Sequence, residues 1–215
     1  MLAARVLCSA AVAALLASLP LVSQGARAAP CSIAPPDVTL TIGATVYAPA
    51  ACADNISQGG GASAETASMN AALGTSFVYL DKSDNAGTPT GLGGVKFTVT
   101  ADAGNNGLWH VTWTDTAGQP NLPLLLDLAV GLFGGNTGAA YLLTNVLLPV
   151  SPNTGTGTFD INFVNKGGQQ PDLSHLLLTG GNPHTPPVPE PAALALFGTA
   201  LLGYGAVRLR RRNQA

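Results

Sequence analysis

The sequence predicts an all-β fold, an antiparallel β-sandwich of about eight strands, for residues 29–180. Apolar and polar residues alternate in short runs, and a period of two places each set on one face of a strand. β-branched and aromatic residues dominate these runs, as half-buried strands favour. The clearest runs are residues 38–42, 95–100, 109–114 and 159–163. Clusters of Asn, Asp and Gly separate them and predict turns at 84–87, 104–107, 134–136 and 166–168.

Three segments complete the predicted domain. The Asn106-Gly107 pair between two alternating runs predicts an antiparallel hairpin with a longer loop. Residues 122–133 and 140–150 are apolar on both faces, which suits either central strands or buried helices. We favour strands, because the glycines at and after position 131 disfavour a long helix in the first of them. Residues 56–75 are compatible with one short helix.

Charge divides the chain into an acidic middle and basic ends. Only 9% of the residues are charged and the net charge is −2. Between residues 29 and 190, however, three lysines stand against all eleven carboxylates, a net charge of −8, and every arginine lies outside. A protein that binds nucleic acid needs a basic surface to displace counterions from phosphates. The composition therefore argues against a nucleic-acid partner.

Residues 1–28 are typical of a secretory signal peptide with a signal helix. Arg5 precedes an uncharged apolar run over residues 6–19, which fits the hydrophobic region of such a signal. Small residues at the end of the segment predict cleavage between Ala28 and Ala29 after passage through the secretion translocon. The alternative is an uncleaved membrane anchor, for which the run is short, since a spanning helix needs roughly 20 apolar residues.

A second targeting signal lies at the C-terminal end of the chain. Residues 181–190 form a Pro-rich stalk and contain most of the Val188, Pro189, Glu190, Pro191 motif. Residues 191–209 are expected to be a single transmembrane helix, although their uncharged part, 192–207, extends for only about 24 Å. The arginines that follow predict a stop-transfer signal and a basic cytoplasmic tail over 210–215. They are Arg208, Arg210, Arg211 and Arg212.

This arrangement resembles the PEP-CTERM sorting tail, in which a Pro-Glu-Pro motif precedes a short apolar helix and a terminal arginine cluster. Proteins with this tail are exported by Gram-negative bacteria, often by those that make exopolysaccharide. The resemblance implies processing by exosortase, a membrane-embedded cysteine transpeptidase, with Pro189, Glu190 and Pro191 as the residues recognised. It also implies an inner-membrane intermediate, transient or permanent, with the domain on the outer side of the membrane. The protein would then reach the cell surface or the extracellular matrix. The alternative is a plain single-pass anchor with a Pro-rich stalk.

The cysteines predict one disulfide. Removal of the signal discards Cys8 and leaves Cys31 and Cys52, an even pair in an oxidising compartment. Their bond would close a loop of 22 residues. Two free thiols remain an alternative, whereas zinc is disfavoured because no second ligand pair accompanies them.

The sequence allows more than one interpretation of several other side chains. Trp109 and Trp113 share one face of a strand, where they either stack on sugar rings or, as we favour, fill the core. His175 alternates with leucines and is interpreted as a hydrogen-bonded strand histidine. Oxygen-rich turns at 81–85 and 102–106 are a minor candidate for Ca²⁺. We assign no cofactor, no metal and no catalytic residue.

The leading functional prediction is therefore a non-enzymatic protein of the cell surface or matrix, associated with exopolysaccharide. A carbohydrate-binding module is the first alternative. A secreted hydrolase, with carboxylates such as Asp115 and Asp160 as acid and base, is the second.

Overall fold

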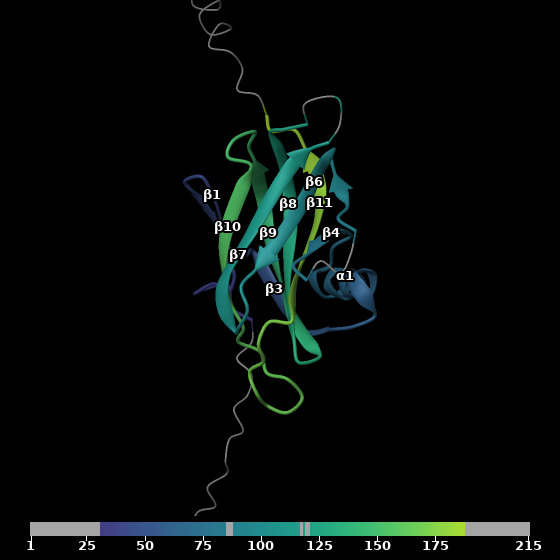
Figure 1. Cartoon of the computed structure of the whole chain (residues 1–215), viewed down its shortest axis with the longest axis vertical. Coiled ribbons are helices and arrows are strands. Elements are labelled where there is room, and N and C mark those ends of the chain that lie inside the picture. The colour runs from purple at the N-terminus through teal and green to yellow at the C-terminus, as the bar shows by residue number, and fades with distance from the viewer. Residues whose placement is uncertain (1–30, 85–87, 117, 119–120, 188–215) are drawn as a thin grey trace, which may run out of the picture.

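The computed structural model describes residues 31–84, 88–116, 118 and 121–187, which form two packed antiparallel sheets with one helix outside them (Figure 1). The six-stranded sheet has the order β2-β1-β10-β7-β6-β5. Its strands are β1 (Leu40–Ile42), β2 (Thr45–Tyr47), β5 (Gly91–Leu92), β6 (Val95–Ala101), β7 (Asn106–Asp115) and β10 (Thr154–Asp160). The five-stranded sheet has the order β3-β9-β8-β11-β4. Its strands are β3 (Ala51–Ser57), β4 (Val78–Lys82), β8 (Leu124–Gly134), β9 (Thr137–Leu148) and β11 (His175–His184).

The predicted all-β sandwich is confirmed for this part of the chain. β6 and β7 form the expected hairpin, with Phe97 opposite Trp113, and the Asn106-Gly107 pair opens its second strand. The two segments that are apolar on both faces are the adjacent strands β8 and β9. The short helix is also present, as α1 (Gly61–Leu73).

The main core lies between the sheets and explains an unusual Thr-Gly alternation in β10. Trp109 from β7 is fully buried, and its indole N–H donates to the Thr39 carbonyl at 3.0 Å. The inward positions of β10 beside it are Gly155 and Gly157. A Cβ on Gly157 would overlap both the Trp109 ring and the Thr39 carbonyl oxygen. Glycine at this position therefore makes room for the tryptophan.

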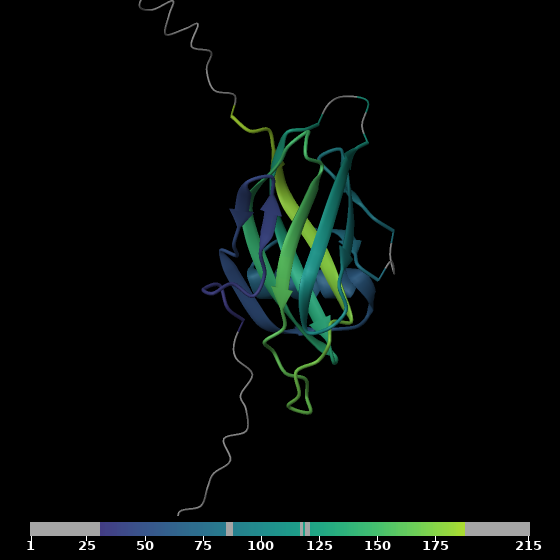
Figure 2. The ribbon, with the colours of Figure 1, turned by 60° about the vertical axis from the view of Figure 1, so that its left-hand side comes forward.

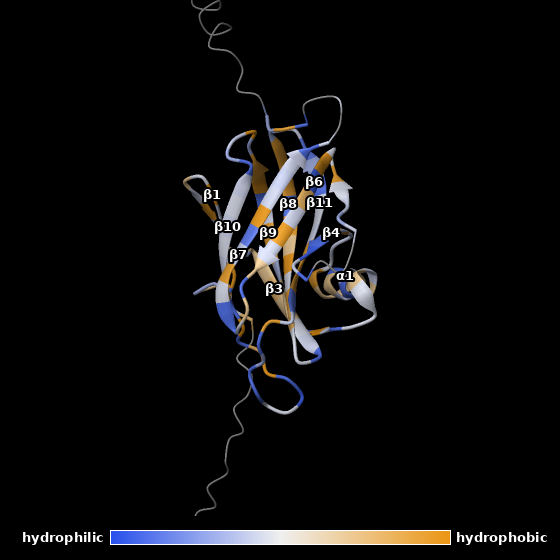
Figure 3. Ribbon diagram, in the orientation of Figure 1, coloured by the Kyte–Doolittle hydropathy of each residue, from blue (hydrophilic) through white to orange (hydrophobic). Residues whose placement is uncertain are grey.

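Helix α1 covers the outer face of the five-stranded sheet. Met69 of the helix is buried there against a second apolar cluster that includes Phe133 and Leu177. Gly131 permits the close approach, since a Cβ at this position would lie 2.7 Å from the Met69 sulfur. The five-stranded sheet is thus covered on both faces around Gly131 and Phe133, whereas Leu147 at the far end of β9 remains 36% exposed. Figure 3 shows hydrophobic colouring along β8 and β9 but alternating colours along β6 and β7. The other sheet keeps one face in solvent, which is why its strands alternate.

Two predictions need correction. The described residues contain eleven strands rather than about eight, because β1, β2 and β5 have only three, three and two residues. The stalk predicted from residue 181 also begins later, because β11 continues to His184, which pairs with Leu125 of β8.

The described chain enters and leaves the sandwich at opposite ends. Cys31 lies at the end that contains the β8–β9 turn, and Pro187 follows β11 at the other end, as the purple and yellow ends of the ribbon in Figure 2 show. The ten residues of β11 separate the two ends by about 33 Å. The predicted signal helix and transmembrane helix lie outside the described residues. Within those residues, the structure has no helix of sufficient length and apolarity to span a bilayer.

Candidate functional site

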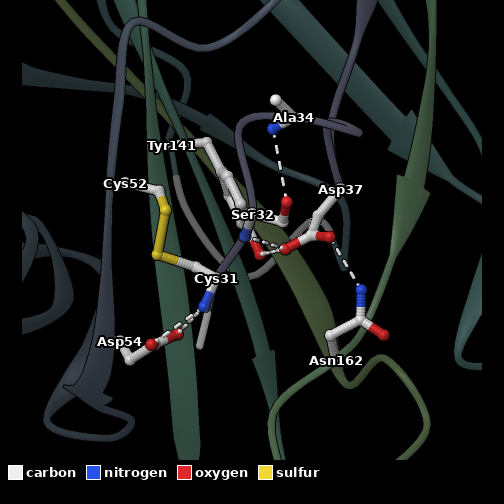
Figure 4. The surroundings of a disulfide bond; sticks show 8 residues. All are labelled: Cys31, Ser32, Ala34, Asp37, Cys52, Asp54, Tyr141 and Asn162. Atoms are coloured by element: carbon white, nitrogen blue, oxygen red, sulfur yellow. Dashed lines mark hydrogen bonds between the residues drawn. A yellow bond between two sulfur atoms is a disulfide. The ribbon is translucent and has the colours of Figure 1, made fainter. Parts of the chain in front are cut away.

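The predicted disulfide joins Cys31 to Cys52 of β3, with the two Cα atoms 6.0 Å apart (Figure 4). The backbone N–H of Cys31 also donates to both carboxylate oxygens of Asp54, each at 2.9 Å. One covalent bond and one charge-assisted hydrogen bond, bifurcated between the two oxygens of a carboxylate, therefore attach Cys31 to an edge strand.

A buried carboxylate continues this attachment. Asp37 is 5% exposed, and its Oδ2 accepts hydrogen bonds from the Ser32 N–H at 2.6 Å and the Tyr141 hydroxyl at 3.0 Å. Its Oδ1 accepts the Asn162 side-chain amide at 2.7 Å (Figure 4). Burial, and then the negative charge of Asp37, raise the pKa of Tyr141, so this hydroxyl remains a donor. These three hydrogen bonds connect the Asp37 carboxylate to Ser32, Tyr141 and Asn162, and so they stabilise the fold.

Removing the disulfide is expected to destabilise the domain measurably. In the Cys31→Ser/Cys52→Ser variant, the loop-closure entropy returned to the unfolded chain lowers the free energy of unfolding by about 3 kcal/mol. Urea denaturation followed by tryptophan fluorescence measures this difference. The wild-type protein with reductant is the control and should lose a similar amount. Equal stability of oxidised wild type and the double variant would contradict the structural role.

A cluster of buried charges lies between helix α1 and the five-stranded sheet. Glu65 of the helix is 2% exposed, and its Oε2 lies 3.1 Å from His175 Nε2 and 3.5 Å from Lys82 Nζ. Lys82 Nζ also lies 3.2 Å from the carboxylate of Asp84. The His175 ring stacks on Phe133, with ring centroids 4.9 Å apart. The interpretation of His175 as a hydrogen-bonded strand histidine is therefore confirmed.

The position of His175 predicts a dependence of stability on pH. Burial lowers the pKa of His175 below its ordinary value of 6.5; the Glu65 charge opposes this shift and Lys82 adds to it. Below pH 6.5 the histidine becomes protonated in the unfolded chain, whereas the buried His175 of the folded chain stays neutral until the pH approaches its lower pKa. The free energy of unfolding should therefore be fully retained above pH 6.5 and fall as the pH decreases toward the folded-state pKa.

Chemical denaturation between about pH 7.5 and pH 5.5 tests this dependence. His175→Gln should flatten the curve, whereas His184→Gln, at an exposed position of the same strand, should leave it as in the wild type. A wild-type curve that rises with acidification in this range would show that the sign is wrong.

The structure contradicts the proposed carboxylate pair of a hydrolase. Asp160 is paired with Asn106 at the start of β7, whereas Asp115 is the last residue of that strand. Nine residues of strand separate them by about 30 Å, compared with roughly 5–10 Å between the two carboxyl groups of glycosidases. Asp115 instead accepts hydrogen bonds from the backbone and side chain of Asn121, which close a loop.

The favoured prediction that Trp109 and Trp113 fill the core is confirmed, and the alternative of glycan stacking is contradicted. Their side chains are 0% and 1% exposed and lie in the core between the sheets. The Trp113 indole N–H donates to the Pro149 carbonyl at 3.1 Å, so both rings are also fixed by hydrogen bonds. Among the residues that the structure describes, no group of three or more His, Cys, Asp or Glu side chains is arranged to hold a metal ion.

A polar cleft of about 440 Å³ lies at the end of the sandwich where Cys31 enters, and we call it the tip cleft. Sequence reasoning missed it, because its walls come from β3, the β8–β9 turn and the loop before β11. Its polar lining residues are Asn55, Ser57, Asn136, Thr137, Asn165 and Lys166. A second cleft of about 410 Å³ lies beside the C-terminal end of α1, and Thr75, Asp127 and Asn182 contribute to its lining.

The predicted sorting and processing residues lie outside the described ranges. They are Ala28 and Ala29, the motif Val188, Pro189, Glu190 and Pro191, and the basic cluster Arg208, Arg210, Arg211 and Arg212. The structure places the exit of the sandwich at Pro187, directly before the motif.

Comparison with known proteins assigns this last segment. Residues 187–212 match the PEP-CTERM protein-sorting motif. The searches of curated proteins and of solved structures returned no match. The chain therefore carries a PEP-CTERM protein-sorting motif at residues 187–212, which implies export, sorting to the surface and exosortase as the processing partner.

Proposed function

We propose that the protein is a non-enzymatic component of the cell surface or extracellular matrix that associates with exopolysaccharide. The observation that carries this proposal is the sorting motif at residues 187–212, directly after the folded domain. In the proposed route, the signal is cleaved between Ala28 and Ala29 after the translocon, and an inner-membrane intermediate presents the domain outside.

The use of the polar side chains supports a structural rather than a catalytic role. Asp37 and Asp54 attach the N-terminal segment, Asp115 closes a loop, and Glu65 is bound to Lys82 and His175. Cys52 is in a disulfide and is not free to act as a nucleophile.

Surface labelling and an activity assay together test the proposal. A membrane-impermeant reagent should label the protein on intact cells of its host, and the protein should be recovered with the polysaccharide fraction. The purified protein should release no reducing ends from that polysaccharide. Recovery inside the cell, or release of reducing ends that scales with protein concentration, would contradict it.

A further inference from the structure

The tip cleft differs from the second cleft because most of its polar side chains form no intramolecular hydrogen bond. In the second cleft, the Asp127 carboxylate accepts the Asn145 N–H and the Asn182 side-chain amide, each at 2.8 Å, and the Thr75 hydroxyl donates to Asn70. Of its polar side chains, those of Thr75, Asp127 and Asn182 are thus already hydrogen-bonded within the fold, and only that of Ser76 is not.

In the tip cleft, by contrast, the side chains of Asn55, Ser57, Asn136 and Thr137 make no hydrogen bond to any other residue that the structure describes. Lys166 likewise forms no salt bridge there. Asn165 uses its carbonyl oxygen to accept two loop N–H groups. Several exposed or half-buried side chains that line this cleft therefore have donors and acceptors without an intramolecular partner.

Two asparagines of the cleft, Asn55 and Asn136, have an unusual backbone conformation. Asn55 has a φ of 59° and lies where the β3–β9 register shifts, so it belongs to a bulge, a device that redirects side chains. Asn136 has a φ of 71° and follows Gly135 in the tight β8–β9 turn. Asparagine is one of the few side chains that accepts this conformation, and glycine would accept it equally.

The chemistry of the lining selects a neutral sugar chain. Each amide side chain offers a donor and an acceptor, which match the adjacent hydroxyl groups of a sugar ring. Ile56 and Val164 give the cleft an apolar wall for the carbon face of such a ring. An anionic ligand fits less well, because Lys166 is the one cation among the lining residues and Asp54 and Asp172 lie at the same end of the sandwich.

The tip cleft also lies at the end of the sandwich that is remote from the sorting motif. Pro187 leads to the sorting motif from the end opposite the tip cleft, about 33 Å away along β11. When the motif is held by the processing enzyme or the envelope, the cleft is therefore at the end remote from that attachment. We infer that the tip cleft binds a neutral polysaccharide and is the contact through which the proposed matrix association is made; this inference rests on the proposed function.

Affinity electrophoresis of the exported protein, purified from its host, tests this inference. The gels contain dextran or galactomannan as neutral probes and alginate as the anionic probe. We expect retardation by a neutral probe, and an association constant lowered about tenfold or more in Asn55→Gly/Asn136→Gly, since two hydrogen-bonding side chains are lost while the backbone keeps its conformation. Asn145→Gly is the matched control, because Asn145 has a φ of 53° but lies outside the cleft, and it should bind like the wild type.

Three results would overturn the inference: no retardation by either neutral probe, retardation by alginate alone, or equal binding by the double variant and the wild type. If the double variant fails to fold, as judged by its urea midpoint, the single variant Asn136→Gly replaces it and should also weaken binding, because it removes one amide side chain and keeps the backbone conformation. Surface labelling of intact cells is measured in parallel. A labelled protein that binds no neutral probe refutes the tip cleft alone, whereas an unlabelled protein refutes the proposed function.

Discussion

Replacing Glu190 by alanine is expected to leave most of the exported protein unprocessed and to deplete it from the cell surface. Glu190 lies between Pro189 and Pro191 within the matched sorting motif, and exosortase is the implied processing partner. Loss of the carboxylate removes the one charged group of the four-residue motif. Immunoblots of membrane, surface and medium fractions should show a larger form retained in the membrane fraction.

The control for this experiment is Asp172→Ala, which removes the same charge at an exposed position of the folded domain, outside the motif. It should be processed and displayed like the wild type. Unchanged processing of Glu190→Ala in cells that contain the sorting enzyme would show that the motif is not used as an exosortase signal.

Replacing Glu65 by alanine is expected to have the largest effect on stability, a loss of about 3–5 kcal/mol in the free energy of unfolding. The side chain of Lys82 is only 9% exposed, and it would keep only the partly exposed Asp84 as a partner for its charge. The Gly59 N–H would also lose its acceptor, the Glu65 Oε1 atom at 3.1 Å. Helix α1 would then be held mainly by its apolar contacts around Met69.

Equilibrium urea denaturation measures the effect, with Ser63→Ala at an exposed position of the same helix as the control. The paired replacement Glu65→Leu/Lys82→Met should recover most of the stability, because it removes both charges instead of leaving one buried. A loss below about 1 kcal/mol in Glu65→Ala, which is the range of exposed pairs, would show that the cluster is solvated rather than buried.

The strands that the sequence predicts most clearly are those with one face in solvent. β6, β7 and β10 alternate because no other element that the structure describes covers the outer face of their sheet. β8 and β9 were ambiguous because helix α1 covers part of the outer face of the other sheet, where both faces of these strands are apolar. Strands of two or three residues, such as β1 and β5, are too short to show any period.

Sites that depend on local sequence could be predicted, whereas sites formed by residues far apart in the sequence could not. The disulfide was predictable because two cysteines remain after signal removal. The shared face of Trp109 and Trp113 was also predictable, but only the sheet pairing shows that this face points inward. The Glu65–His175 contact joins residues 110 positions apart, and no local pattern indicates it. The tip cleft arises in the same way, from a bulge, a turn and a loop that only the fold brings together.

Mass spectrometry of the intact protein purified from its native host tests the central claim, sorting through residues 187–212, most directly. We predict a chain that begins at Ala29, carries the Cys31–Cys52 bond and ends close to the Val188–Pro191 motif. A chain that retains the apolar segment and the arginines through Ala215 in the surface fraction would contradict processing at the motif.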